Sequence, residues 1–163
     1  MNFKKILLAV DASDNAMRAV EYVGDIAGDC AGFSVELLCI ERLPHRDLYP
    51  DEEAWKKACE ATRTELRKFL NRARDHLVGM GVSLDRLTEQ YVTSCASPFD
   101  EPGPACSQGT GTAQEILNAL DAGGFGTVVV GRRGVSKAEE FLFGSVSNKI
   151  IHSVKNSTVW VVA

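Results

Sequence analysis

The residues best suited to binding an anion lie between positions 131 and 147. Gly131 ends a run of three valines, Gly134 follows after two residues, and Gly144-Ser145 follows after nine more, with Ser147 close behind. Glycine lets the backbone approach a ligand closely, and the first turn of a helix directs N–H groups and hydroxyls at a phosphate. The spacing therefore predicts a phosphate-binding loop that leads into a helix. The alternative is a glycine-rich loop that binds nothing, because loops also use glycine for turns.

A second candidate, Asp11, lies early in the chain. It directly follows the apolar run Phe3–Val10 and precedes Ala12, Ser13 and an amphipathic helical pattern. In open α/β sheets, ligands bind beyond the carboxyl ends of the strands. Asp11 is therefore placed either to face a ligand or simply to cap the following helix.

Strands and helices alternate along the chain, which predicts an α/β fold. The expected topology is a doubly wound, five-stranded parallel sheet in the order 3-2-1-4-5, with helices on both faces and a single domain over residues 1–163. This order places the first and fourth strands side by side, so Asp11 and Gly131 would face one crevice. Strands are expected at residues 3–10, 33–40, the second half of 84–93, 127–131 and 158–162, and helices at about 16–27, 52–80, 113–120 and 146–154.

The helix expected over residues 52–80 has one apolar stripe, which is typical of a helix packed on a sheet. Its other face carries charged residues that include Arg63 and Glu65. The simplest interpretation of that face is a solvated surface.

The segment 94–110 contains three prolines and two glycines and is expected to form an extended surface loop. Cys95 and Cys106 flank it and could pair or sense oxidants. Because cytosolic thiols usually stay reduced, the favoured expectation is two free thiols. After the loop, Thr112 is predicted to cap a helix, with Glu115 as its capping-box partner.

The composition excludes some classes of function. The chain has 163 residues, 45% of them apolar, and a formal net charge of −4. A nucleic-acid binder usually shows a basic face, and no apolar stretch approaches the length of a membrane span. We therefore expect a cytoplasmic protein whose partners include neither nucleic acid nor a membrane.

The glycine–serine spacing, V-D-A-S at 10–13, L-L-C-I at 37–40 and T-V-W-V-V at 158–162 resemble the universal stress protein family over the whole chain. The resemblance implies an adenine nucleotide alpha-hydrolase-like fold that binds ATP or AMP, with or without Mg²⁺ or Mn²⁺. It also implies a homodimer through the Thr158–Val162 strand.

The resemblance further implies roles for individual residues. Asp11 would lie by the ribose and phosphates, with indirect contact to a metal, and the backbone of Ile40 would contact the adenine. The remaining expected nucleotide-binding residues are Ala12, Ser13, Gly131, Arg133, Gly134, Gly144, Ser145, Val146 and Ser147. Arg133 either neutralises phosphate charge or is a solvated loop residue. The chain departs from the family pattern in its longer 94–110 segment and in Ala12, which replaces a common glycine.

Three functions remain open at this point. The favoured one is a dimeric, adenine-nucleotide-binding regulatory protein of the universal stress response. The alternatives are a slow ATPase and a ligand-free dimeric scaffold. The sequence has no P-loop and no kinase signature, so no catalytic residue is assigned.

Overall fold

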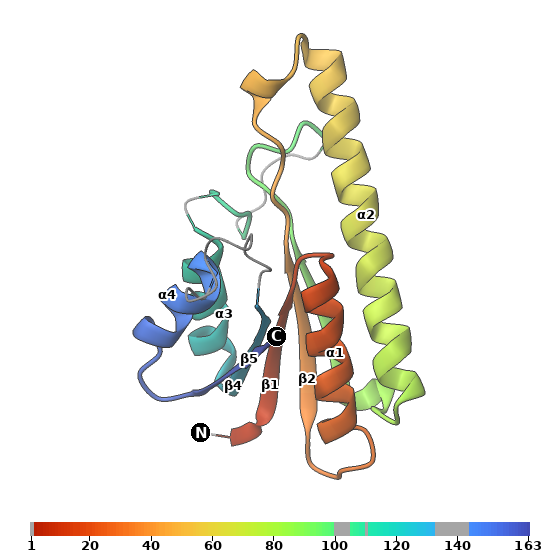
Figure 1. Ribbon diagram of the computed structural model, residues 1–163, viewed down its shortest axis with the longest axis vertical. Helices are drawn as coiled ribbons and strands as arrows, with labels where there is room; N and C mark the ends of the chain where they lie inside the picture. The colour runs from red at the N-terminus through yellow and green to blue at the C-terminus, as the bar shows by residue number, and fades with distance from the viewer. Residues whose placement is uncertain (1, 100–104, 110, 133–143) are drawn as a thin grey trace.

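The sheet of this protein has five parallel strands in the order β3-β2-β1-β4-β5, which confirms the predicted α/β fold and strand order (Figure 1). The structure is a computed structural model that describes residues 2–99, 105–109, 111–132 and 144–163. The strands are β1 (Asn2–Val10), β2 (Ser34–Ile40), β3 (Leu87–Val92), β4 (Phe125–Gly131) and β5 (Thr158–Val162).

The two central strands, β1 and β4, are apolar on both faces. Leu7 pairs with Val128 and Leu8 with Val129, and all four side chains are fully buried. Strands in the middle of a parallel sheet have this composition because helices cover both faces. The pairing places the carboxyl ends of β1 and β4 side by side.

Helices cover both faces of the sheet, as predicted (Figure 1). The helices α1 (Asp14–Ala27) and α2 (Glu52–Gly79) pack on one face, and α3 (Thr112–Gly123) and α4 (Ser145–Ser153) on the other. Short 3₁₀ helices occupy Arg46–Leu48 and Leu84–Arg86. Among the described residues, no helix has both the length and the hydropathy of a membrane span.

The predicted cap of α3 is wrong. The helix begins at Thr112 itself, with Gly111 at the N-cap position and no side-chain cap. Glu115 does not bond back to the cap; its Oε1 accepts a hydrogen bond of 2.7 Å from the hydroxyl of Ser107. The Thr112 hydroxyl accepts one of 3.1 Å from Arg42. Both side chains therefore have tertiary partners instead of each other.

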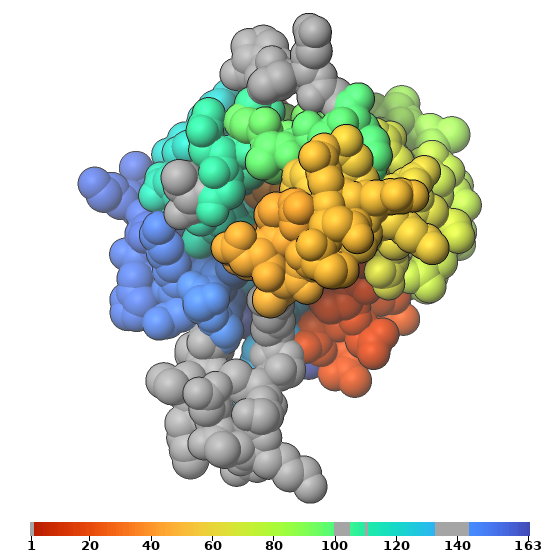
Figure 2. Space-filling view, turned by 90° about the horizontal axis from the view of Figure 1, so that it is seen from above, coloured from red at the N-terminus to blue at the C-terminus, as the bar shows by residue number. Residues whose placement is uncertain are grey.

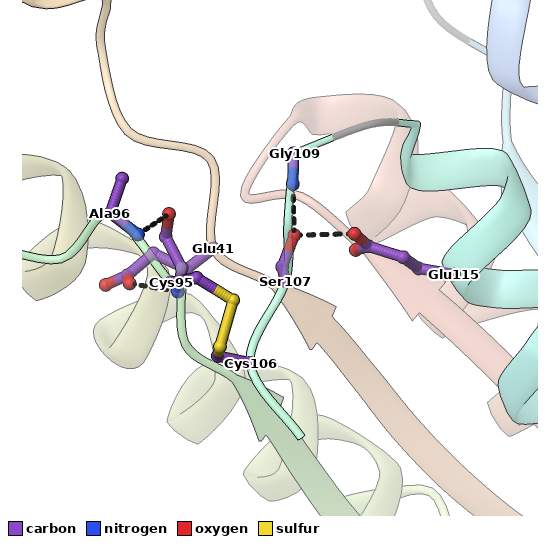
Figure 3. Close-up of a disulfide and its surroundings, with 8 residues drawn as sticks. Glu41, Cys95, Ala96, Cys106, Ser107, Gly109 and Glu115 are labelled. Atoms are coloured by element: carbon purple, nitrogen blue, oxygen red, sulfur yellow. Dashed lines mark hydrogen bonds between the residues drawn. A yellow bond between two sulfur atoms is a disulfide. The ribbon is translucent and has the colours of Figure 1, made fainter. Parts of the chain in front are cut away.

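The expectation of two free thiols in the 94–110 segment is also wrong. Cys95 and Cys106 form a disulfide, with Cα atoms 5.0 Å apart (Figure 3). A short parallel bridge between Ser94 and Ser107 brings the cysteines together, since Cys95 N–H donates to the Ser107 carbonyl. No periodic pattern in the sequence predicts that the residues around Ser94 and Ser107 lie side by side.

Two further cysteines, Cys39 and Cys59, are fully buried. Burial raises the pKa of the Cys39 thiol to about 12, and the nearby carboxylates of Asp11 and Glu41 add to the rise. Burial also raises the pKa of the Tyr91 hydroxyl, which donates to the carboxylate of Glu41. The folded protein thus favours the neutral form of both groups.

This preference predicts a loss of stability at alkaline pH. The contribution of Cys39 is fully present below pH 9, the pKa of the exposed thiol, and is lost as the pH rises from 9 toward 12. Over that interval one such group changes the free energy of unfolding by about 1.4 kcal/mol per pH unit. Melting temperatures measured from pH 7 to 11 should fall less steeply in Cys39→Ala than in wild type or in Cys30→Ala, which removes an exposed thiol. Equal slopes in all three proteins would contradict the prediction.

Candidate functional site

A cleft of about 350 Å³ lies at the carboxyl ends of β1, β2 and β4. Figure 2 looks onto this end of the molecule and shows α4 and α1 on opposite sides, with the chain that follows β2 between them. All of the predicted site residues that the structure describes line the cleft: Asp11, Ala12, Ser13, Ile40, Gly131, Gly144, Ser145, Val146 and Ser147. Arg133 and Gly134 lie outside the described residues.

One side of the cleft is apolar. Leu38, Ile116 and Val130 are buried side chains that also belong to the core between the sheet and α3 and α4. Ile40 continues this surface at the end of β2. Ligand sites in proteins combine an apolar wall with a few polar groups that fix the ligand's orientation. The polar groups here come from the β1–α1 turn and from the start of α4.

The β1–α1 turn assigns separate roles to its two polar residues. Ser13 is the N-cap of α1, since its hydroxyl accepts a hydrogen bond of 3.1 Å from Ala16 N–H. Asp11 Oδ1 in turn accepts a bond of 2.6 Å from the Ser13 hydroxyl. The helix therefore does not need Asp11 as its cap. Asp11 is exposed and lines the cleft.

Between these two residues, Ala12 has a left-handed backbone with φ of 63°, alone among the described non-glycine residues. This conformation costs a residue with a Cβ roughly 1–2 kcal/mol, and glycine adopts it freely. The strain explains why a glycine would suit this position.

Ala12→Gly is therefore expected to raise the free energy of unfolding by about 1 kcal/mol, after the greater freedom of glycine in the unfolded chain is subtracted. Urea titration measures the change. Ala61→Gly is the control, because Ala61 is exposed in the middle of α2 and its replacement should destabilise by about 1 kcal/mol. A loss of stability in both variants would show that the turn gains nothing from glycine.

The first turn of α4 presents its N–H groups to the cleft. The first hydrogen bond within the helix is donated by Asn148 N–H to the Gly144 carbonyl. The N–H groups of Ser145, Val146 and Ser147 precede it and have no partner within the helix. The Ser147 hydroxyl is buried and donates to the Gly144 carbonyl at 3.0 Å, so it shapes the turn. The Ser145 side chain is exposed at the rim.

Gly131 has a structural reason to be glycine. A Cβ at this position would lie 2.4 Å from the Asn15 carbonyl oxygen and 2.8 Å from Ala16 N. The end of β4 and the first turn of α1 thus approach too closely for any side chain. The sequence relates this glycine to a ligand, whereas the structure relates it to the packing of two walls of the cleft.

Several residues at the cleft were not predicted. Arg42 lies two residues beyond Ile40. Its guanidinium donates a hydrogen bond to the hydroxyl of Thr112, the first residue of α3, and both residues line the cleft. Thr62 and Glu65 reach the cleft from α2, and Glu65 comes from the face expected to be solvated. Following β2 past its end would have suggested Arg42. The approach of α2 depends on tertiary packing and left no signal in the sequence.

The described residues offer little to a metal ion on their own. Among them, no group of three or more histidine, cysteine or acidic side chains lies close enough together to bind one. Asp11 and Glu65 supply the carboxylates that line the cleft.

Solved structures with the same fold include a protein from the universal stress protein family from Burkholderia pseudomallei, 17% identical with a TM-score of 0.67. The alignment covers 98% of this chain and 96% of that chain. A universal stress protein in complex with cAMP is 19% identical with a TM-score of 0.66, covering 100% and 99% of the two chains. One from Archaeoglobus fulgidus in complex with dAMP is 20% identical with a TM-score of 0.61, covering both chains fully.

At these identities the structural likeness establishes the fold. No curated protein sequence matches the chain significantly. The family model described as the universal stress protein family matches residues 2–163, which is nearly the whole sequence. The chain therefore belongs to the universal stress protein family.

Proposed function

We propose that the cleft binds an adenine nucleotide and that the protein is a nucleotide-binding regulator of the universal stress response. The observation that carries the proposal is the meeting of nine predicted residues, from four separate segments of the chain, around one cleft of about 350 Å³. Two of the similar structures are complexes with cAMP and dAMP, which supports the adenine nucleotide class.

The two sides of the cleft suggest the orientation of the nucleotide. The apolar wall formed by Leu38, Ile40 and Ile116 suits the adenine ring, and the backbone of Ile40 would contact its edge. The N–H groups at the start of α4 suit the phosphates, because a helix N-terminus attracts anions. Asp11 would accept a hydrogen bond from a ribose hydroxyl.

ATP, AMP and a metal ion remain part of this proposal. Arg133 and Gly134, which lie outside the described residues, remain predicted phosphate-binding residues. Mg²⁺ or Mn²⁺ bound to ATP would neutralise part of the phosphate charge, with Asp11 contributing indirectly. Arg42 is added to the predicted set, since it is a cation at the cleft.

Calorimetric titration of the purified protein tests the proposal. We expect AMP and ATP to bind with micromolar dissociation constants and GMP to bind more weakly. The absence of heat at millimolar nucleotide would favour the ligand-free scaffold instead. Phosphate release from bound ATP at several turnovers per minute would favour the ATPase.

We also propose that the protein is a homodimer through β5, which is an edge strand whose outer backbone groups are available for pairing. Lysine on an edge strand opposes such pairing. Thr158→Lys, at an exposed position, is therefore expected to raise the dimer dissociation constant at least tenfold in sedimentation equilibrium. Thr158→Gln, which adds length without charge, should stay dimeric. A Thr158→Lys protein that dimerises like wild type would place the interface elsewhere.

A further inference from the structure

We propose that Cys95–Cys106 is a reversible redox-modification site that sets the nucleotide affinity of the cleft; the proposal rests on the nucleotide-binding function above. The disulfide joins two arms of the segment between β3 and α3. The first arm contains Ser94 and Cys95, and the second contains Cys106 and Ser107. Both cysteines are only partly buried, so a small thiol reagent or a redox protein can reach them. The first arm is hydrogen bonded to Glu41 directly after β2, and the second to Glu115 in α3 (Figure 3).

The first arm is attached to the end of β2. Ser94 N–H donates to Glu41 Oε2 at 2.8 Å, and the Glu41 side chain is fully buried. The other carboxylate oxygen, Oε1, accepts from the Tyr91 hydroxyl at 2.9 Å and lies 3.8 Å from Arg63 Nε. A buried carboxylate with several partners holds its own backbone in place. Glu41 stands between Ile40 and Arg42, which both line the cleft.

The second arm is attached to α3. Ser107 is buried, and its hydroxyl donates to Glu115 Oε1 at 2.7 Å and accepts from Gly109 N–H at 3.2 Å. Glu115 is in the first turn of α3, the same turn as Thr112 and one residue before Ile116. Thr112 and Ile116 line the cleft, so a shift of this turn changes the cleft wall.

The arms and the walls form a closed ring of contacts. Arg42 from the β2 side donates to Thr112 on the α3 side at 3.1 Å. On the far side of the ring the arms meet through the disulfide and through the backbone bonds of Cys95 N–H to the Ser107 carbonyl and Ser107 N–H to the Thr93 carbonyl. The disulfide is a covalent bond between the side chains of the two arms.

The Ser107–Glu115 contact in the ring depends strongly on the disulfide. Glu115 Oε2 is buried and has no hydrogen-bond partner among the described residues. A buried carboxylate oxygen without a partner favours release of the side chain to water. Opening the disulfide returns conformational freedom to the chain between the cysteines, which weakens the Ser107–Glu115 contact. The link between the α3 wall and the β2 wall that runs through the two arms is then weaker, and nucleotide binding must supply the cost of ordering both.

The chemistry of the switch is thiol–disulfide exchange. A dithiol reductant attacks one sulfur of Cys95–Cys106, the S–S bond breaks, and a mixed disulfide forms. The second thiol of the reductant displaces the protein, so two thiols of the protein are formed and the reductant ends as a disulfide. In the reverse direction a hydroperoxide, ROOH, accepts two electrons and two protons from Cys95 and Cys106, giving ROH, water and the S–S bond. A disulfide of this reversible kind is compatible with the expected cytoplasmic location.

The test compares AMP affinity in the oxidised and the dithiothreitol-reduced protein by calorimetry. Thiol titration in denaturant confirms each state, with three thiols in the oxidised chain, Cys30, Cys39 and Cys59, and two more after reduction. We expect reduction to raise the dissociation constant for AMP about fivefold to tenfold. Cys95→Ser/Cys106→Ser should bind like the reduced wild type and not respond to dithiothreitol. Cys30→Ser is the matched control, because it removes an exposed thiol outside the disulfide and should keep the full response.

Two results would overturn the inference: equal affinities of the oxidised and reduced wild type, or a response to dithiothreitol that persists in the double serine variant. If the oxidised protein does not bind AMP, the proposed function fails, and amide hydrogen exchange then decides the redox coupling. Reduction should speed exchange at Ser94, at Ser107 and in the first turn of α3. Unchanged exchange in that turn would refute the coupling.

Discussion

Gly131→Ala is expected to lower the free energy of unfolding by about 3 kcal/mol, at the upper end for an added methyl group in a packed site. The new Cβ would lie 2.4 Å from the Asn15 carbonyl oxygen, and backbone atoms cannot rotate away as a side chain can. Either β4 or the first turn of α1 must therefore move. Chemical denaturation of the purified variant measures the loss.

The control for this prediction is Gly79→Ala, at the end of α2. A Cβ there meets nothing within 4 Å, and alanine has the higher helix propensity. The control should be unchanged or more stable by up to about 1 kcal/mol. Equal effects of the two substitutions would show that β4 and α1 are not packed as described.

Asp11→Ala is expected to weaken AMP binding about 30-fold. A hydrogen bond to a charged group contributes about 1.5–3 kcal/mol, and 1.4 kcal/mol corresponds to tenfold in affinity. Asp11 lines the cleft and holds the Ser13 hydroxyl at 2.6 Å, so its loss removes both a ligand contact and the fixed geometry of the turn. Calorimetry with AMP measures the change, and melting temperature shows whether the fold is kept.

Asp14→Ala is the matched control for Asp11→Ala. Asp14 is an exposed carboxylate in the first turn of α1 and does not line the cleft. It removes the same charge from the same region and should leave the affinity within about twofold, because exposed charges interact weakly through water. Undiminished AMP binding in Asp11→Ala would place the nucleotide away from this carboxylate. If Asp11→Ala keeps AMP binding but no longer releases phosphate from ATP, Asp11 would instead act in an ATPase reaction.

The strand order and the meeting of Asp11 with Gly131 were predictable from the sequence. Alternating strand and helix patterns with right-handed crossovers allow few topologies, and the chosen one puts the ends of β1 and β4 together. The adjacency of these two residues, 120 positions apart, follows from the order alone. Local patterns also indicated the start of α4, where Gly144 and Ser145 carry both the turn and the helix cap region.

The parts that were not predictable depend on chain segments without periodicity. Ser107 takes Glu115 away from its expected capping role because the 94–110 segment returns beside α3, and no local pattern encodes that path. The same return pairs Cys95 with Cys106. Glu65 lines the cleft although it was expected on a solvated face of α2, because the packing of α2 on the sheet decides which of its residues reach the cleft. Tertiary contacts therefore decide these details, and local propensity does not.

The buried Glu41 shows how such contacts connect the fold to the site. It follows Ile40 directly and has no sequence signature. Its carboxylate accepts hydrogen bonds from Ser94 N–H and the Tyr91 hydroxyl and forms an ion pair with Arg63. Burial of an acid is costly unless partners satisfy it. Because Glu41 lies between the cleft residues Ile40 and Arg42, its contacts help to fix the backbone that lines the proposed nucleotide site.

The most direct test of the binding account is a crystal structure of the oxidised protein grown with saturating AMP. The account predicts the adenine against the backbone of Ile40 and the phosphate within hydrogen-bond distance of the N–H groups of Ser145, Val146 and Ser147. AMP bound at a different surface, or a cleft without nucleotide at saturating AMP, would contradict it.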